Sequence, residues 1–420
     1  MSLRDELVEI FEAAVASLPG DALVRDALAR MRTSLPSDPH KIVVIALGKV
    51  AGPMAHGAVA ALGNCSGLAI GPAGLDAPAG FEAIEGEHPL PGPRSIRAGI
   101  RLLSFVSAIR RDQTAVVLLS GGASALAEAL PSNLSLLDLS STTKLLLGAG
   151  APIEEINIVR KHLSRIKGGR LAAACNAERI ELLALSDVEH DDLAVIGSGP
   201  FSPNSSKFSD VLQIFERWKI ETKVPAAVLE HLYEGRYESP QPDDPAFERV
   251  RARILAGPKE LAVAGTLEAQ RRGFRPVAPG EFMKGDVEEV AKRYTRWLES
   301  EPGRRSILVA AGEPTVVLPS QAGRGGRSQQ LALLMANVLD RTAGEAAFLA
   351  AGSDGKDGTS DHAGAVVDGE TAQRARSMGF DLDEALRTAS SAAACEILGA
   401  SIPSVASETN LTDLHLLAIG

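Results

Sequence analysis

Short apolar runs rich in valine, isoleucine, leucine and alanine alternate along this chain with longer segments whose apolar residues recur every three or four positions. The short runs predict buried strands, at residues 41–47, 114–119, 180–185, 253–256, 306–311, 315–318 and 348–351. The longer segments predict helices, among them two within residues 3–33 and others within 208–232 and 286–300. Alternating strands and helices are typical of an α/β fold.

A polar, proline-rich segment at residues 233–245 interrupts this pattern. A chain of 420 residues is also too long for one typical core. We therefore expect two α/β domains, over residues 1–238 and 239–420. Both domains present glycine-rich loops at strand ends, so we expect the active site in the cleft between them.

Composition narrows the class of protein. Hydrophobic residues make up 45% and charged residues 23% of the chain, as in soluble globular proteins. A net charge of −10 argues against nucleic acid as a partner. The three cysteines are far apart, which favours reduced thiols and a cytoplasmic location. The first residues predict an acidic amphipathic helix rather than a signal sequence, and no apolar run approaches the roughly 18 residues of a membrane span.

Two loops in the N-terminal half follow predicted strands directly. Gly48-Lys49 would place a lysine at the carboxyl end of a strand, although the spacing is not that of a Walker A loop and a surface lysine is the alternative. Ser120-Gly121-Gly122-Ala123-Ser124 predicts a nest of backbone amides that binds an anion. A serine-hydrolase elbow is the alternative there, but G-x-S-x-G is absent.

A glycine cluster in the C-terminal half carries Arg324 and Arg327 just before a helix that should open at about Ser328. Backbone N–H groups, the positive end of a helix and planar guanidinium groups together suit a phosphate or a carboxylate. The alternative is an ordinary loop with solvated arginines.

Residues 151–171 predict a helix that Gly168-Gly169 ends. Arg160, Lys161, Ser164 and Lys167 recur at helical spacing and would form one polar face. Such a face is either solvated or part of a binding site.

Carboxylates follow two further strands. Asp187 and Asp191 are candidate magnesium ligands, directly or through water. Asp354, Asp357 and Asp361 lie among glycines, in a spacing that does not fit an EF-hand. Lysine, arginine and aspartate at such loops suit phosphoryl transfer to an alcohol.

Taken together and in order, these motifs resemble the glycerate 2-kinase family with the MOFRL C-terminal domain. They are Gly48-Lys49, residues 87–89, 120–125, 158–169, 186–188, 198–200, 312–315, 325–329, 355–358 and 409–413. The chain departs from the family pattern at several positions. His190, Ala123 and Glu408 stand where relatives usually have glycine, and Ser328-Gln329-Gln330 replaces a run that is usually similar to Asn-Gln-Glu.

The resemblance implies an N-terminal Rossmann-like domain and a smaller C-terminal domain whose MOFRL region covers about 305–415. It further implies that ATP phosphorylates the 2-hydroxyl of D-glycerate, with Mg²⁺ or another divalent cation, and that Lys49, Arg327 and Asp354 are catalytic. A homodimer is the expected assembly. Hydroxypyruvate reductase chemistry and a non-catalytic anion-binding protein are the alternatives, although no G-x-G-x-x-G follows an early strand. The residues expected to bind substrate or nucleotide are His88, Ser120, Gly121, Gly122, Ser124, Lys167, Gly312, Glu313, Thr315, Gly325, Gly326, Asp357 and Asn410.

Overall fold

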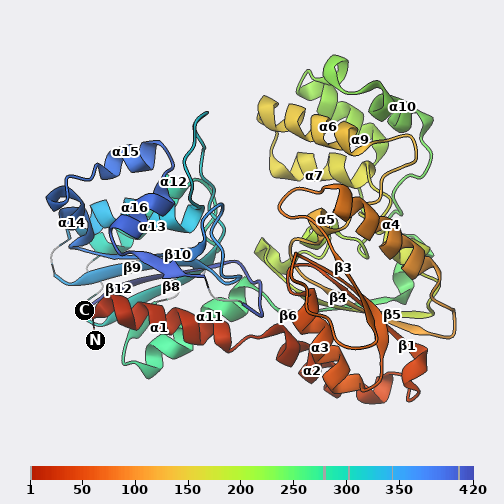
Figure 1. Ribbon diagram of the computed structural model, residues 1–420, viewed down its shortest axis with the longest axis horizontal. Coiled ribbons are helices and arrows are strands. Elements are labelled where there is room, and N and C mark those ends of the chain that lie inside the picture. Colours follow the sequence, from red (N-terminus) through yellow and green to blue (C-terminus); the bar gives the residue numbers. More distant parts are fainter. Residues whose placement is uncertain (1, 278–280, 301–302, 343, 405–406) are drawn as a thin grey trace. The chain divides into compact units, whose positions relative to one another are not determined.

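The computed structural model describes residues 2–277, 281–300, 303–342, 344–404 and 407–420. Contacts divide the chain into two compact units (Figure 1). Unit 1 contains the chain up to Pro19, Asp187–His190 and Ala256–Gly420, and unit 2 contains Gly20–Ser186 and Asp191–Leu255. The division therefore falls at residue 255 rather than at the expected 238, and the first helix belongs to the same unit as the C-terminal half.

Unit 2 is built on a six-stranded sheet. In spatial order its strands are β3 (Phe81–Glu85), β2 (Ser66–Gly71), β1 (Ile42–Leu47), β4 (Thr114–Leu119), β5 (Arg179–Leu185) and β6 (Val250–Ala256). Strands β1 to β5 pair in parallel. This is the Rossmann order, in which the direction of winding reverses between β1 and β4. The expected Rossmann-like domain is confirmed.

Helices cover both faces of this sheet. The crossovers from β1 to β2 and from β3 to β4 run in opposite directions along the sheet. Because nearly all such crossovers are right-handed, their helices α3 and α4 should lie on opposite faces, as Figure 1 shows. A second apolar core joins α6, α7, α9 and α10. The α-helices of unit 2 are α2 (Gly20–Arg30), α3 (Ala51–Leu62), α4 (Pro93–Ser107), α5 (Ala123–Leu126), α6 (Leu136–Ala149), α7 (Ile153–His162), α8 (Arg170–Ala174), α9 (Phe208–Arg217) and α10 (Ala226–Glu234).

Unit 1 contains a mixed six-stranded sheet. In spatial order its strands are β11 (Ser401–Pro403), β10 (His362–Asp368), β9 (Ala346–Gly352), β12 (Asp413–Ile419), β8 (Ser306–Gly312) and β7 (Arg275–Val277). Strand β12 pairs antiparallel with both β8 and β9, and β7 pairs in parallel with β8. The C-terminal strand of the sheet is therefore also one of its two central strands.

The helices of unit 1 form two layers around this sheet (Figure 1). One face carries α1 (Leu3–Ala16) and α11 (Pro258–Arg271). The other carries α12 (Val287–Glu299), α13 (Arg327–Leu339), α14 (Thr371–Ser377), α15 (Leu382–Arg387) and α16 (Ser391–Ile397). The core of this second layer centres on the fully buried rings of Tyr294 and Phe348. Among the described residues, no helix combines the length and the apolar character needed to cross a membrane.

Short 3-10 helices complete the structure: η1 (Arg32–Ser34), η2 (Pro39–Lys41), η3 (Glu189–Asp191), η4 (Ile196–Ser198), η5 (Glu221–Lys223) and η6 (Pro245–Arg249). Two sequence predictions were wrong. Residues 315–318 form no strand, because only Thr315 makes an isolated bridge, to Asp286. The helix predicted over 151–171 ends at His162, so Ser164 and Lys167 do not continue its polar face.

Candidate functional site

Two loops of unit 2 meet at the carboxyl ends of β1 and β4, where the winding of the sheet reverses. Leu47 and Leu119 end these strands in register. Beyond them the Lys49 N–H donates to the Gly121 carbonyl oxygen (2.9 Å), and the Ser120 hydroxyl accepts the Val50 N–H (3.2 Å). The two loops predicted from sequence are thus bonded into one structure, at the position where doubly wound folds bind ligands.

Because Gly122 has no side chain, Lys49 and His88 can pack against the Ser120–Ser124 loop. Its φ of 81° lies in the left-handed region that favours glycine. A Cβ at Gly122 would lie 2.9 Å from Lys49 Cγ and 3.2 Å from His88 Cδ2. The loop therefore has no room for a side chain here, because Lys49 and His88 already occupy that space.

Ser124 connects the loop to α7 and to the short 3-10 helix over Ile196–Ser198. Its Oγ accepts hydrogen bonds from Arg160 Nη2 (3.1 Å) and from Ser198 Oγ (3.0 Å). Ser198 has a φ of 64°, which is uncommon for a residue with a side chain and typical of functional turns. Arg160 was one of the residues assigned to the predicted polar face, and the structure places it at the loop.

Lys167 lies elsewhere than the helical pattern suggested. It is 1% exposed and forms an ion pair with the fully buried Glu128. The other Glu128 oxygen accepts the Ser164 hydroxyl (2.6 Å) and the Ala129 N–H (2.9 Å). Burial lowers the pKa of Lys167, whereas the Glu128 carboxylate acts in the opposite direction. In this arrangement Lys167 supports the loop from within the protein.

Asp357 of unit 1 binds the first turn of α13. Its two oxygens accept the N–H groups of Ser328 (3.0 Å) and Gln329 (2.7 Å). A Cβ at Gly326 would lie 2.1 Å from Asp357 Oδ1, so the glycine permits this close approach. Burial, reinforced by the negative charge of Asp413, raises the pKa of Asp357 to about 7. Asp357 is 2% exposed and holds the helix that begins at Arg327.

Arg327 is held by two carboxylates. Its Nε and Nη2 donate to the two oxygens of Asp413 (2.7 and 3.0 Å), and its Nη1 donates to Glu313 Oε1 (2.6 Å). The Asp413 side chain is 4% exposed, compared with 43% for Glu313. Burial acts to raise the pKa of Asp413, but Arg327 outweighs it and the pKa is lowered. Asp413 therefore remains ionised and fixes the guanidinium plane.

Glu313 has a second acidic neighbour in Asp187. The Asp187 carboxylate accepts a hydrogen bond from Asn410 Nδ2 (3.0 Å). Loss of solvation raises the pKa of Glu313, although its side chain is partly exposed; Arg327 opposes this effect and Asp187 and Asp413 add to it. The structure thus brings the predicted residues Asp187, Glu313, Arg327 and Asn410 together within unit 1.

Asp354 lies beside the Arg327–Asp413 pair. A Cβ at Gly352, the last residue of β9, would lie 3.1 Å from Asp354 Oδ1 and 3.4 Å from Asp413 Oδ1. The Asp354 oxygen also accepts the Lys356 N–H (3.1 Å), which closes the turn. Two carboxylates therefore approach the same strand end.

The remaining predicted residues of unit 1 hold their own backbone turns. Gly312 ends β8 and accepts the Thr412 hydroxyl at its carbonyl oxygen (2.7 Å). The Thr315 N–H donates to the Gly285 carbonyl oxygen (2.8 Å), and the Gly325 N–H donates to Thr359 Oγ1 (3.1 Å). These bonds leave the exposed side chain of Thr315 available to a ligand.

Asp191 and its neighbour have unusual backbones. His190 and Asp191 have φ values of 63° and 54°, in the region where glycine is less costly, so glycine at position 190 in relatives is readily explained. Asp191 Oδ1 is buried and makes no hydrogen bond within the described structure. An orphaned carboxylate oxygen of this kind suits a hard cation. In the described ranges no group of three or more His, Cys, Asp or Glu residues could hold a metal by itself.

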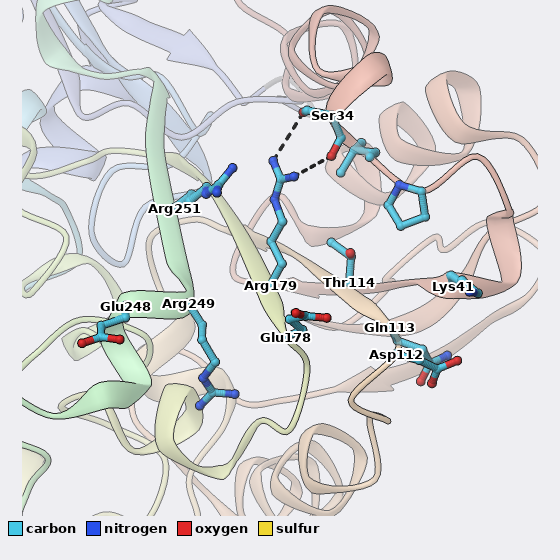
Figure 2. A pocket seen from close by; sticks show the side chains of 12 residues that line it. Ser34, Lys41, Asp112, Gln113, Thr114, Glu178, Arg179, Glu248, Arg249 and Arg251 are labelled. Atoms are coloured by element: carbon cyan, nitrogen blue, oxygen red, sulfur yellow. Dashed lines mark hydrogen bonds between the residues drawn. The ribbon is translucent and has the colours of Figure 1, made fainter.

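A cavity of about 620 Å³ lies at the other end of the unit 2 sheet, where β1, β4 and β5 begin (Figure 2). Its arginines are largely engaged by the protein. Arg179 donates to Ser34, to its carbonyl oxygen (2.5 Å) and to its hydroxyl (3.3 Å), and Arg249 donates to backbone carbonyls that include those of Cys175 (2.6 Å) and Ala177 (2.9 Å). The cavity is thus separated from the loops described above by the length of the strands.

Comparison with known proteins agrees with both halves of the chain. Residues 6–233 match a family described as a domain of unknown function (DUF4147), and residues 306–413 match the MOFRL family. The D-glycerate 2-kinase of Thermotoga maritima is 32% identical over 428 residues, which cover 98% of this chain and 97% of that protein. A relative from Agrobacterium vitis with a provisional hydroxypyruvate reductase name is 32% identical over 434 residues, or 100% of this chain and 95% of that protein.

Solved structures extend the comparison to the fold. The crystal structure of a glycerate kinase from T. maritima superposes with a TM-score of 0.85 at 30% identity, covering 100% of this chain and 99% of that one. The similarity therefore includes both units and all of the motifs found in the sequence. The chain belongs to the glycerate 2-kinase family with a MOFRL C-terminal domain.

Proposed function

We propose that this protein is a glycerate kinase that transfers the γ-phosphoryl group of ATP to the 2-hydroxyl of D-glycerate, giving 2-phosphoglycerate. The observation that carries the proposal is the similarity to a D-glycerate 2-kinase over 98% of this chain and 97% of that protein. The loops at Lys49 and Ser120–Ser124 and the region around Arg327 are the two proposed anion-binding sites, and both lie within this similarity. A kinase that phosphorylates an organic acid needs two of them, one for the nucleotide phosphates and one for the acid.

Phosphoryl transfer demands positioning and charge stabilisation more than covalent chemistry. Lys49 and Arg327 are assigned to the phosphate oxygens, whose charge moves toward the leaving group during transfer. Asp354 is assigned as the acceptor of the hydroxyl proton. A strong base is not needed for this role, because a loose transition state requires little deprotonation of the nucleophile.

The contacts of Arg327 refine its assigned role. Three of the five guanidinium N–H donors are used by Asp413 and Glu313, which leaves two. Asp413 is buried and holds one edge of the guanidinium, so that edge is structural. Glu313 is the more exposed partner, and an arriving phosphate would compete with it for Nη1. Asp413 thus orients Arg327 and Glu313 occupies its ligand-facing edge.

A divalent cation fits the acidic residues of this chain. Asp187, which lies beside Glu313, is assigned as a ligand together with water, since Mg²⁺ is usually bound by one or two carboxylates. Asp191, whose Oδ1 makes no hydrogen bond in the described structure, is the other carboxylate proposed as a ligand. When bound, the cation would neutralise charge on the phosphate oxygens of ATP.

The product distinguishes the proposed reaction from its alternatives. With ATP, Mg²⁺ and D-glycerate, the product should be consumed by enolase directly, without phosphoglycerate mutase. A product that requires the mutase first would indicate phosphorylation at the 3-hydroxyl. Absence of turnover would favour an anion-binding protein, and reduction of hydroxypyruvate by NADH at a comparable rate would favour the reductase.

A further inference from the structure

We propose that Arg160 binds the carboxylate of the acceptor substrate beside the Ser120–Ser124 loop. The proposal rests on the proposed function and names the group that selects a carboxylic acid over a simple alcohol. It depends on contacts within unit 2 alone.

The hydrogen bonding of Arg160 differs from that of the other half-buried arginines of unit 2. Its guanidinium makes one hydrogen bond to the described residues, to Ser124 Oγ, and no ion pair. By contrast, Arg170 donates to three carbonyl oxygens, Arg249 donates to three, and Arg101 binds both oxygens of Glu82. Arg160 therefore keeps most of its five N–H donors unused in the described structure.

The nearest buried carboxylate cannot serve as its partner. Both oxygens of Glu128 are used, by Lys167 on one side and by Ser164 and the Ala129 N–H on the other. Within the described residues, Glu128 therefore makes no hydrogen bond or ion pair with Arg160. Burial lowers the pKa of Arg160, and the Glu128 carboxylate opposes this effect without contacting the guanidinium. A half-buried guanidinium with one hydrogen bond to the described residues would gain from an anionic ligand.

Ser124 supplies a second donor at the same position. Its oxygen accepts from both Arg160 and Ser198, so its own hydroxyl proton is directed away from them. The backbone of Ser198, with an uncommon φ of 64°, positions the Ser198 hydroxyl that donates to Ser124. A guanidinium edge next to a hydroxyl donor matches the two oxygens of a carboxylate.

A carboxylate fits this position better than a phosphate does. The other cation of the same loop structure is Lys49, which lies against Gly122 and is assigned to phosphate oxygens. With Lys49 assigned to phosphate, Arg160 is left for the other anionic group of the reaction, which is the carboxylate of the acid.

The test compares Arg160→Gln and Arg160→Lys with Arg165→Gln, a matched control in which an exposed arginine five residues along the chain is changed. Steady-state kinetics gives KM for D-glycerate, KM for ATP, and the ratio of kcat/KM for D-glycerate to that for glycerol, which lacks the carboxylate. Charge-assisted hydrogen bonds predict a rise in KM for glycerate and a fall in this ratio of about 10- to 100-fold in Arg160→Gln. Arg160→Lys should recover part of both losses, and Arg165→Gln should match the wild type.

Several results would overturn the proposal. An increase confined to KM for ATP would assign Arg160 to phosphate, and equal increases for both substrates would make it structural. An unchanged ratio of glycerate to glycerol would exclude carboxylate recognition.

Calorimetric titration with glycolate, a minimal 2-hydroxy acid, separates this proposal from the proposed function. Wild-type protein that fails to phosphorylate D-glycerate refutes the function. Glycolate binding that is lost in Arg160→Gln and kept in Arg165→Gln would still support a carboxylate site, whereas equal glycolate affinity in all variants would refute it.

Discussion

Replacing Gly122 by alanine should reduce turnover far more than replacing Gly235 by alanine, because both glycines have a left-handed backbone but only Gly122 lies against Lys49. The φ and ψ values are 81° and −13° at Gly122 and 64° and 13° at Gly235, so each alanine is forced into the left-handed region at a cost of about 1–2 kcal/mol. A Cβ at Gly235 meets nothing within 4 Å, whereas a Cβ at Gly122 would lie 2.9 Å from Lys49 Cγ. The difference in kcat between the two variants therefore measures the effect of displacing Lys49.

The magnitude follows from the contact distance. Two carbon atoms pack best at about 3.5–4.0 Å, so Lys49 must move by roughly 0.6–1.1 Å to admit the new Cβ. Misplacement of a catalytic group by about 1 Å can lower the rate by about 10²-fold. We therefore expect kcat in Gly122→Ala to fall roughly 10- to 100-fold below that of Gly235→Ala, with similar losses in Tm.

The assay is ATP consumption with D-glycerate at saturation, measured beside a thermal unfolding curve for each variant. Equal kcat in the two variants would refute the reasoning, because it would mean that the position of Lys49 does not limit the reaction. A much lower Tm for Gly122→Ala alone would instead mean that the new Cβ destabilises the folded loop rather than displacing Lys49.

Three further predictions concern charge. Arg327→Lys should lower kcat by at least about 10²-fold, because a lysine cannot bind both oxygens of Asp413 while it also contacts phosphate, whereas Arg324→Lys, at an exposed ion pair, should change it only a few-fold. Asp354→Asn should lower kcat by about 10²–10⁴-fold with little change in nucleotide affinity, measured by steady-state kinetics and ATP titration. Burial lowers the pKa of His162 to about 3, so the unfolded chain gains a proton below pH 6.5 that the folded chain does not. The free energy of unfolding in urea should therefore fall by up to about 1.4 kcal/mol per pH unit between pH 6.5 and 3, and His162→Gln should remove that contribution.

Each of these predictions has a result that contradicts it. Equal, mild losses at Arg327 and Arg324 would make both arginines parts of a solvated loop. Near-normal turnover in Asp354→Asn would show that this carboxylate is not the base. The same pH slope with and without His162 would mean that other groups account for the acid sensitivity.

The meeting of Lys49 with the Ser120–Ser124 loop could be predicted from the sequence, because each follows an apolar run. Neighbouring parallel strands end at the same edge of a sheet, so loops that follow them are brought together. The helix that begins at Arg327 could be predicted for a similarly local reason. Glycines precede it directly, and its apolar residues follow at helical spacing.

The partners of Arg327 and Lys167 could not be predicted, because they depend on contacts between distant segments. Asp413 reaches Arg327 only because β12 inserts between β8 and β9, an order of strands that no local pattern encodes. Its sequence signals were its place in the 409–413 motif and a carboxylate at the start of an apolar run. Lys167 continued a helical spacing, but the helix ends at His162 and Glu128 then pairs with the lysine across 39 residues of chain.

The central position of β12 makes the chemistry of unit 1 depend on the strand of its sheet that is synthesised last. Of the strands in this sheet, β12 is the last to leave the ribosome, and domains fold as the chain emerges. Before residues 413–419 are made, β8 and β9 lack their shared neighbour, and Arg327 lacks the buried carboxylate that orients it. An unfinished chain therefore exposes unpaired strand edges, which are sites of aggregation and of chaperone recognition. It also cannot orient Arg327 for phosphoryl transfer. A chain that stops a few residues before β12 should be inactive and a target for degradation, however complete its other parts are.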